Sequence, residues 1–251
     1  MKLNGNTIFI TGGTSGIGRA LAEELHKLGN QVIISGRRKA LLEEVTAANP
    51  GMKSIELDIG SQASIKAASA KLIAEFPTLN VLINNAGIMH IDDASTAVDD
   101  EMMQSTIVTN LMGPIRLTGA LVEHLKRQPS AAIINVSSVL AFTPLAVSAV
   151  YSSTKAALHS YTMSLRWRLK GTPVQVLELS PPWVQTDLLD SREEPRAMPL
   201  REFISETIAV LGTDTTEVLV ERAKPLRDAA GTNEYAFVDQ FNDMFISPPE
   251  A

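Results

Sequence analysis

Six short runs of apolar, largely β-branched residues recur along this chain, and longer segments with helical periodicity separate them. The runs cover residues 6–11, 31–35, 53–57, 81–84, 131–136 and 174–179. The helical patterns between them lie near 17–28, 39–48, 62–75, 102–126 and 152–169. Strands without polar alternation are buried on both faces, which is typical of a parallel sheet covered by helices. The alternation therefore predicts an α/β fold with a doubly wound, Rossmann-like parallel sheet.

The pattern changes after residue 182, where prolines and charged residues interrupt the periodicity as far as Pro199. A loop of this length is typical of a functional segment, and we expect a substrate lid near residues 188–212. Helical patterns follow near 200–211, 215–229 and 234–245. Because no linker or internal repeat interrupts the chain, we expect a single domain, 1–251, with a sheet of six or seven strands.

The charge balance and residue types exclude several classes of function. The net charge is −6, and no basic run is longer than Arg37–Lys39, which argues against a nucleic-acid partner. The chain has no cysteine, which excludes disulfides, zinc–thiolate sites and a thiol nucleophile. The four histidines have no metal-binding spacing, so we expect no metal. No segment is long and apolar enough for a secretory signal or a membrane span, and we expect a cytoplasmic protein with no membrane partner.

A glycine-rich turn, "TGGTSGIG", joins the first predicted strand to the first predicted helix. Its glycines are Gly12, Gly16 and Gly18. Glycine lets the backbone approach a pyrophosphate closely, and a helix N-terminus offers free N–H groups and a partial positive charge. A packing turn is the simpler interpretation of the glycines alone. Their place in the first strand–helix unit favours a dinucleotide-binding site.

The residues after the second predicted strand distinguish two cofactors. An acidic residue there suits the ribose of NAD, whereas an arginine suits the 2′-phosphate of NADP. Gly36 stands where the acid is expected, and Arg37 and Arg38 follow it. A guanidinium group donates paired, charge-assisted hydrogen bonds to phosphate, although solvated arginines are also common on protein surfaces. The pattern favours NADP(H) and leaves NAD(H) open as a second cofactor.

Tyr151 and Lys155 stand four residues apart in a predicted helix, so their side chains share one face. A neighbouring cation favours the phenolate and lowers the pKa of tyrosine from about 10. Ser138 follows the fifth predicted strand, at the edge where open α/β sheets bind ligands. A Tyr-x-x-x-Lys pair alone occurs on many helices. Together with Ser138 it predicts a proton-transfer site.

These motifs resemble those of the short-chain dehydrogenase/reductase family in its simple, non-extended form, over roughly residues 5–188. The matching segments are the glycine turn, Asp58, "NNAG" at Asn84–Gly87, Asn110 in "TNLMGP", Ser138, Tyr151 with Lys155, and "SPPWVQTD" at Ser180–Asp187. The C-terminal segment resembles the DltE-like subgroup. The family's usual Pro-Gly after the sixth strand is Pro181-Pro182 here, and its closing strand is absent, which favours six strands.

The resemblance implies a role for each matching residue. Tyr151 would be the general acid/base, Lys155 would lower its pKa and hold the nicotinamide ribose, and Ser138 would polarise the substrate carbonyl. Asn110 would hold a water in a proton relay to Lys155. The implied cofactor contacts are Gly12, Thr14, Ser15, Gly16, Ile17, Gly18, Arg37, Arg38, Asp58, Ile59, Asn85, Ala86, Gly87, Tyr151, Lys155, Pro181, Val184 and Thr186.

Within that set, the resemblance places each group of residues on one part of the cofactor. Asp58 and Ile59 would flank the adenine, and Asn85–Gly87 would line the ribose. Val184 and Thr186 would contact the nicotinamide carboxamide. The family also implies a homodimer built on the helices near 102–126 and 152–169.

We therefore expect an NADP(H)-dependent enzyme acting on a small-molecule carbonyl or alcohol. A non-catalytic dinucleotide-binding sensor is the alternative, although it would not need Asn110 together with Ser138, Tyr151 and Lys155. An epimerase or dehydratase ranks last, because such relatives usually have longer chains and a different glycine spacing. The sequence does not identify the substrate, and whether His90 and Phe142 border its pocket is left open.

Overall fold

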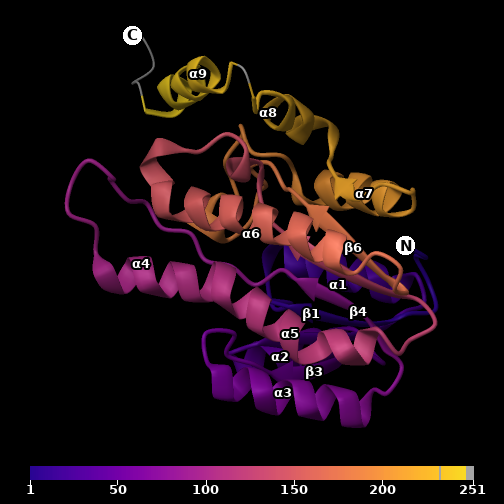
Figure 1. The fold of residues 1–251 in the computed structure, drawn as a ribbon. Helices are drawn as coiled ribbons and strands as arrows, with labels where there is room; N and C mark the ends of the chain where they lie inside the picture. Colours follow the sequence, from indigo (N-terminus) through magenta and orange to yellow (C-terminus); the bar gives the residue numbers. More distant parts are fainter. Residues whose placement is uncertain (232, 247–251) are drawn as a thin grey trace.

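The sheet at the centre of the molecule has seven parallel strands in the order β3-β2-β1-β4-β5-β6-β7. The strands are β1 (Thr7–Thr11), β2 (Gln31–Gly36), β3 (Lys53–Glu56), β4 (Leu79–Asn84), β5 (Ala131–Val136), β6 (Val174–Leu179) and β7 (Glu217–Val218). The computed structural model describes residues 1–231 and 233–246, so residues 232 and 247–251 of the expected 1–251 domain lie outside it. The predicted doubly wound parallel sheet is confirmed (Figure 1).

Helices cover both faces of this sheet. They are α1 (Gly16–Lys27), α2 (Lys39–Ala48), α3 (Gln62–Glu75), α4 (Asp100–Ile107), α5 (Gly113–Leu125), α6 (Ala149–Arg168), α7 (Leu200–Leu211), α8 (Lys224–Asp228) and α9 (Glu234–Ile246). Apolar side chains of α1, α2 and α7 pack on one face, and those of α3, α5 and α6 pack on the other. None of the described helices is both long enough and apolar enough to cross a membrane.

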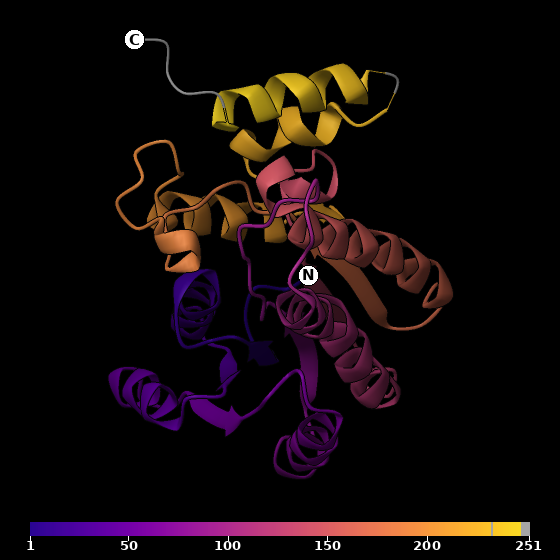
Figure 2. The same ribbon diagram turned by 90° about the vertical axis from the view of Figure 1, so that its left-hand side faces the viewer.

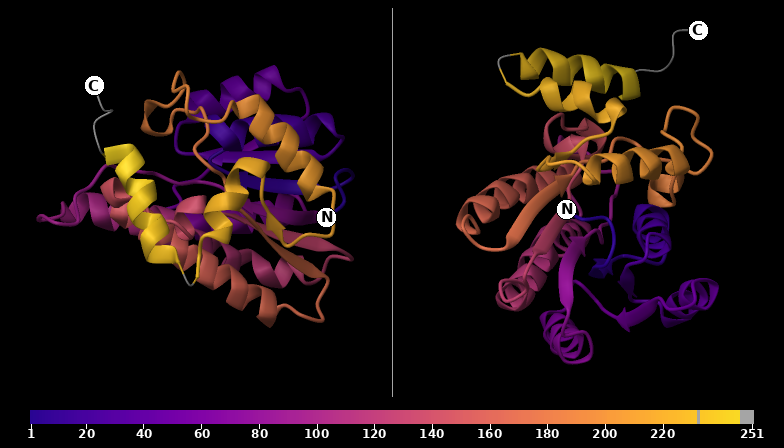
Figure 3. Two further views of the ribbon diagram at one scale, coloured as in Figure 1. Left: turned by 90° about the horizontal axis from the view of Figure 1, so that it is seen from above. Right: turned by 90° about the vertical axis from the view of Figure 1, so that its right-hand side faces the viewer.

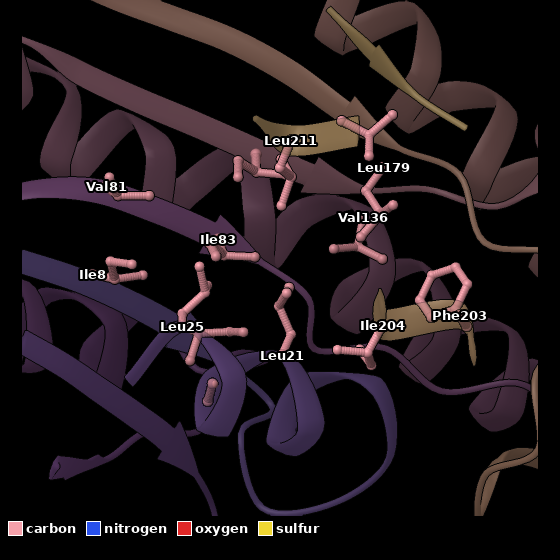
Figure 4. Close-up of a cluster of buried hydrophobic side chains, with 14 of the residues drawn as sticks. Ile8, Leu21, Leu25, Val81, Ile83, Val136, Leu179, Phe203, Ile204 and Leu211 are labelled. Carbon is pink, nitrogen blue, oxygen red and sulfur yellow. The ribbon is translucent and has the colours of Figure 1, made fainter. Parts of the chain in front are cut away.

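The central strands are buried on both faces, as their lack of alternation predicts, whereas the edge strand β3 is partly exposed. All five residues of β1 and all six of β5 are buried. On the first face, Leu21 and Leu25 of α1 and Phe203 of α7 pack against the sheet (Figure 4). These side chains recur at helical spacing, so each helix presents one apolar stripe. The strand order reverses between β1 and β4, which is where ligands bind in doubly wound sheets.

The segment 102–126, expected to be one helix, is interrupted. A π-helical turn, η1 (Val108–Met112), separates α4 from α5, and Asn110 lies in it. The Asp99 side chain caps α4 by accepting a hydrogen bond from the Met102 backbone N–H at 3.0 Å. Periodicity does not distinguish such a turn from regular helix, because only one hydrogen-bond register changes. π-turns are frequent at functional sites.

The sheet was expected to have six or seven strands, and it has seven. β7 exists and pairs with β6 through Glu178–Glu217 and Leu179–Val218. It occupies the start of segment 215–229, which was expected to be helical, and only α8 and a 3-10 turn, η5 (Glu221–Ala223), are helical there. A strand of two residues has no periodicity to detect, and its formation depends on the neighbouring edge of β6.

The C-terminal segment 234–245 is helical, as predicted, and forms most of α9. Together α8 and α9 lie over the loop that follows β5 (Figures 2 and 3). The Asn242 side chain donates to the Pro144 carbonyl at 3.0 Å and accepts a hydrogen bond from the Ala146 backbone N–H. The Thr143 hydroxyl donates to the Leu226 carbonyl at 3.0 Å. These contacts fix the C-terminal helices beside the carboxyl ends of β4, β5 and β6.

Candidate active site

A cavity of about 970 Å³ opens at the carboxyl ends of the central strands. Its wall contains every residue of the predicted catalytic and cofactor-binding sets except Asn110. The glycine turn after β1, the ends of β2 and β3, the loop after β4, α6 and the loop after β6 all contribute to it. Residues as far apart in the sequence as Gly12 and Thr186 (186 − 12 = 174 positions) therefore line the same cavity.

The glycine turn has the geometry of a phosphate cradle. Gly12 has a φ of +70°, and a Cβ there would lie 2.9 Å from the Ala86 Cα. At Gly18 a Cβ would lie 2.2 Å from the Gly12 carbonyl oxygen. No side chain fits at either position, so the turn leaves bare backbone at the N-terminus of α1, where anions bind well.

The loop after β4 is tied to this turn. The Asn85 side chain donates to the Thr11 carbonyl at 2.9 Å. The Thr11 hydroxyl oxygen lies 3.0 Å from the backbone N–H groups of both Asn85 and Ala86 and accepts from them. Asn85 thus holds the two loops together and leaves Ala86 and Gly87 to line the cavity.

The end of β2 carries two exposed arginines. Arg37 and Arg38 line the cavity, and within the described ranges neither has an ion-pair partner. A Cβ at Gly36 would lie 3.1 Å from Thr14 Cγ2, so a larger residue such as an acid would press against the glycine turn. The arrangement lacks the carboxylate that suits an unphosphorylated ribose and offers cations that suit a phosphate.

At the opposite end of the cavity, the predicted catalytic side chains are buried. Ser138, Tyr151 and Lys155 are 7%, 7% and 3% exposed. Ser138 precedes a 3-10 turn, η2 (Val139–Ala141), and its oxygen accepts from the Leu140 backbone N–H at 3.1 Å. The Lys155 amine donates to the Val136 carbonyl at 2.8 Å and lies 5.4 Å from the centre of the Tyr151 ring.

Burial changes the proton affinity of both members of the pair. It raises the pKa of Tyr151 to about 12, and a hydrogen bond with the Ser138 side chain opposes this rise. It lowers the pKa of Lys155 to about 8, against the influence of the Glu178 carboxylate. In the ligand-free protein, loss of hydration therefore dominates, because each charged form is costly out of water. The sequence led us to expect that Lys155 lowers the pKa of Tyr151. In the ligand-free protein the leading influence on that pKa is burial, which raises it.

Asn110 lies behind the cavity wall and is 1% exposed. Its side-chain nitrogen donates to the Ile88 carbonyl at 2.8 Å, and its side-chain oxygen accepts from the Ile88 backbone N–H at 2.8 Å. A Cβ placed on Gly87 would be 3.4 Å from that oxygen and 3.7 Å from the Lys155 amine nitrogen. Asn110 thus fixes the loop after β4 close to Lys155.

The remaining predicted contacts lie between these two ends. Asp58 is exposed and its carboxylate accepts from the Gly60 backbone N–H at 3.0 Å, while Ile59 is buried. The Pro181 carbonyl accepts from the Val139 N–H at 3.0 Å, so the Pro-Pro turn is joined to η2. Val184 pairs with Met198 in a short bridge. This bridge joins the two ends of the loop between residues 184 and 198, which includes the start of the expected lid.

Sequence reasoning missed the outer wall of the cavity. Leu226 of α8, Phe241 of α9 and Arg222 of η5 line it, together with Trp183 and Leu140. His90 and Phe142, which were left open, do not line it. The C-terminal wall could not be found from local motifs, because it depends on how α8 and α9 fold back. Within residues 1–231 and 233–246, no group of histidine and acidic side chains is placed to hold a metal ion.

Comparison with known proteins agrees with this geometry. A family model described as short chain dehydrogenase matches residues 6–197. The uncharacterized oxidoreductase DltE of Bacillus subtilis (strain 168) is 38% identical over 248 residues, covering 96% of this chain and 98% of the relative. This relative confirms the resemblance to the DltE-like subgroup.

Two solved structures share the fold over most of their length. A short chain dehydrogenase from Burkholderia cenocepacia J2315 in complex with NADP has a TM-score of 0.82 and 26% identity, with 99% of this chain and 100% of that chain covered. A 3-ketoacyl-(acyl-carrier-protein) reductase from Brucella melitensis complexed with NADH has a TM-score of 0.78 and 28% identity, with 85% and 93% covered. This chain belongs to the short-chain dehydrogenase family of oxidoreductases.

Proposed function

We propose that this short-chain dehydrogenase is an NADP(H)-dependent enzyme that transfers a hydride between nicotinamide and a small-molecule carbonyl or alcohol. One observation carries the proposal: buried Ser138, Tyr151 and Lys155 occupy one end of a cavity whose other end carries Arg37 and Arg38. The first end suits proton transfer away from water, and the second suits a phosphate. A dinucleotide bound in this cavity would have its phosphate and its nicotinamide at these two ends.

Tyr151 acts as the general acid when a carbonyl is reduced. Its pKa of about 12 keeps the phenol protonated at neutral pH, ready to donate to the carbonyl oxygen. The Ser138 hydroxyl donates a hydrogen bond to the same oxygen. The reduced nicotinamide, when bound, supplies the hydride to the carbonyl carbon. Lys155 leaves the Val136 carbonyl to hold the nicotinamide ribose, and its positive charge stabilises the phenolate formed after proton transfer.

Asn110 and Gly87 would form the route by which Tyr151 recovers its proton. The Asn110 side-chain oxygen accepts one hydrogen bond from Ile88 and has a second lone pair free to accept from a water. The Gly87 position leaves room beside both this oxygen and the Lys155 amine. A water there would connect the amine to the loop after β4.

Arg37 and Arg38 would hold the 2′-phosphate of NADP(H). Their side chains are exposed, and Gly36 carries no carboxylate that would repel the phosphate. The comparisons include one relative with NADP and one with NADH, so the preference depends on these residues of the present chain. The pyrophosphate would lie on the bare backbone of the glycine turn.

The substrate would enter between the loop after β6 and the C-terminal helices. The side chains that line this part are mostly apolar, among them Leu140, Trp183, Leu226 and Phe241. Ligand pockets of this kind have apolar walls with a few polar groups that orient the ligand. A carbonyl compound with an apolar substituent would fit that lining.

The lid expected near 188–212 stays a prediction. We expect only the first part of this segment to move. Leu188 and Leu189 line the cavity and are 40% and 38% exposed. Leu189 and Asp190 have φ values of +53° and +51°, an unfavourable region for such residues. Because Phe203 and Leu211 of α7 are fully buried, we expect movement near 188–196 and not in α7. Limited proteolysis with and without NADPH would test this, and equal cleavage rates would contradict it.

We also propose a homodimer built on α4, α5 and α6. Met163 and Trp167 on α6 are 47% and 63% exposed, and Met112 at the end of η1, directly before α5, is 36% exposed. Large apolar side chains that form an exposed patch are typical of an interface. Light scattering should give the mass of two chains, and Trp167→Glu should lower it toward one. A wild-type mass of one or four chains would contradict the proposal.

The function is tested by a panel of carbonyls and alcohols, followed at the nicotinamide absorbance with NADPH, NADH and their oxidised forms. We expect turnover of at least one compound and a preference for the phosphorylated cofactor. Tight NADPH binding without turnover of any compound would favour a dinucleotide sensor. The cytoplasmic location stays a prediction, which cell fractionation would test.

A further inference from the structure

A row of buried polar side chains crosses the sheet directly below the catalytic end of the cavity. Asn84 of β4, Asn135 of β5, Glu178 of β6 and Glu217 of β7 are neighbours in register. The first three are 2%, 0% and 1% exposed. The row lies on the sheet face that α5 and α6 cover, where the other inward side chains are apolar. Polar groups in such a place require partners.

Three members of the row are either neutral or have their charge balanced by a partner. The Asn84 side chain donates to Asn135 at 2.8 Å, and Asn135 donates to the Thr162 hydroxyl at 2.9 Å. Glu217 forms an ion pair with Arg227 at 2.9 Å. These contacts engage both amides and the carboxylate on β7, although the Asn84 Oδ1 has no hydrogen-bond partner among the described residues.

Glu178 is the exception. Its side chain is 0% exposed, and one carboxylate oxygen lies 2.7 Å from the His159 Nδ1. The other oxygen, Oε1, has no hydrogen-bond partner within the described part of the chain. A buried carboxylate with an unbonded oxygen is strongly unfavourable unless a positive charge lies nearby. The His159 ring is positively charged only when it is protonated, and it engages only one of the two oxygens.

Lys155 is the cation that suits this place. It precedes His159 by one helical turn, so both side chains project from the same face of α6 toward the sheet. Its amine donates to the Val136 carbonyl, and Val136 directly follows the residue that pairs with Glu178. Among the described residues no carboxylate oxygen lies within 4.0 Å of the Lys155 amine, so Glu178 acts on this amine from beyond ion-pair distance. The Tyr151 ring and Gly87 also lie near the amine.

The other charged groups around Glu178 are already engaged. Arg227 is paired with Glu217 and lies over the Phe142 ring, 4.6 Å from its centre. Glu217 is the main cause of the raised pKa of Arg227, and the Glu178 carboxylate contributes to it. The Arg166 guanidinium donates to the carbonyls of Val176 and Thr216 at 2.9 and 3.2 Å. The Glu178 carboxylate raises the pKa of Lys155 against the opposite effect of burial, which agrees in sign with the geometry.

We infer that Glu178 is the counter-ion of Lys155 and that His159 holds it in position, so that the pair keeps the Lys155 amine protonated where it is needed. Glu178 and His159 do not line the cavity, so they are positioning residues that act through Lys155. The inference deepens the proposed function, because the importance of a protonated Lys155 rests on that function. Lys155 and Glu178 are both buried in the protein without any cofactor.

The direct test is an NMR titration of Lys155 in ligand-free protein labelled with [ε-¹³C]lysine. The Lys155 signal is assigned as the one missing from Lys155→Arg. In Glu178→Gln, which keeps the shape and loses the charge, the midpoint of the Lys155 titration should fall by about 1 pH unit or more, as expected for loss of a nearby opposite charge. His159→Gln should lower it in the same direction by less.

Glu217→Gln is the matched control. It makes the same chemical change in the same row one strand further on, and it should move the Lys155 midpoint by less than half as much as Glu178→Gln. Circular dichroism and thermal unfolding establish that each variant is folded, and if Glu178→Gln is not, His159→Gln decides by the same titration. An unchanged midpoint in the folded variant, or an equal shift in Glu217→Gln, would overturn the inference.

The titration needs neither cofactor nor substrate, so its outcome is independent of the proposed function. Where a substrate has been identified, the alkaline limb of the pH profile of kcat/KM should move to lower pH in Glu178→Gln, with kcat at the optimum changed by less. A shifted Lys155 midpoint without a substrate or cofactor effect would support the charge pair and count against the proposed function.

Discussion

The two ends of the cavity use charged residues in opposite ways. At one end Arg37, Arg38 and Asp58 are exposed, so water and salt screen their charges and each contact with a ligand has a modest effect. At the other end Tyr151 and Lys155 are almost completely buried, and loss of hydration moves the pKa of both. Exposure therefore suits the choice of a cofactor, and burial suits the transfer of a proton.

The comparison also explains why one expectation about the catalytic pair was incomplete. The spacing of Tyr151 and Lys155 correctly predicted that they are neighbours on one helix face. It did not reveal that both would leave water, which raises the pKa of the tyrosine and lowers that of the lysine. The same two residues on an exposed helix would favour the phenolate through their mutual attraction.

The largest effect is expected at the buried end. Tyr151→Phe removes only the phenolic oxygen, and it should lower turnover by roughly a hundredfold to ten-thousandfold, the usual contribution of a positioned acid/base. NADPH affinity should change little, which fluorescence titration measures. Tyr161→Phe, on the same helix but outside the cavity, is the control. Turnover close to that of the wild type would remove Tyr151 from the proposed role.

The second prediction concerns the stability of the ligand-free protein. The pKa of Lys155 is about 8 when folded and 10.5 as its reference value, so the folded protein loses this proton first as the pH rises. Above pH 10.5 the amine is neutral in both states and does not destabilise the fold. As the pH falls toward 8, the unfolded state takes up the proton first, and the free energy of unfolding decreases. Between pH 8 and 10 the free energy of unfolding should gain about 2–3 kcal/mol from this group.

Denaturant unfolding of wild type and Lys155→Met over that pH range measures the effect as a difference between two curves. Exposed Lys66→Met should follow the wild type. The comparison ends at pH 10, because above it the raised pKa of Tyr151 acts with the opposite sign: its contribution is present below 10 and is lost toward 12. Parallel curves for wild type and Lys155→Met would show that Lys155 is not desolvated as described.

At the exposed end, the expected effect is smaller and depends on the ligand. Arg37→Asp should weaken NADPH binding by about ten- to a hundredfold, because it removes a charge-assisted hydrogen bond and adds repulsion. NADH, which lacks the phosphate, should bind about as before. Lys39→Asp, at the start of α2 and outside the cavity wall, is the control. Equal losses for both cofactors, or a wild type that prefers NADH, would contradict the phosphate site.

The smallest expected effect is that of salt, which should change cofactor binding at the exposed end of the cavity and leave the chemical step at the buried end nearly unchanged. Raising the salt concentration from about 50 to 500 mM shortens the Debye length from roughly 14 Å to about 4 Å. NADPH affinity should fall a few-fold more than NADH affinity, because the phosphate contact is exposed. The rate of the chemical step should change little, since Tyr151 is buried. Parallel salt dependence of the two affinities would show that no exposed phosphate contact contributes.

Local signals were sufficient for most of the fold and for the chemical groups of the site. The six longer strands and the helices at 39–48, 62–75 and 200–211 lie where periodicity predicted them. All the predicted site residues except Asn110 line one cavity, because motifs that follow parallel strands must meet at the same edge of the sheet. These features depend on neighbours in sequence, so the sequence displays them.

Other features depend on residues that are far apart in the chain. β7 forms only because the edge of β6 is present, and α9 lies at the site because Asn242 meets the loop at 143–146. Likewise, Glu178 is a residue type usually found at the surface, and only the packing of α6 on the sheet brings His159 into contact with it. Sequence by itself determined which chemical groups the chain carries and on which elements. Tertiary structure decided which of them leave water and which come together, because burial and long-range contact are properties of the packed molecule.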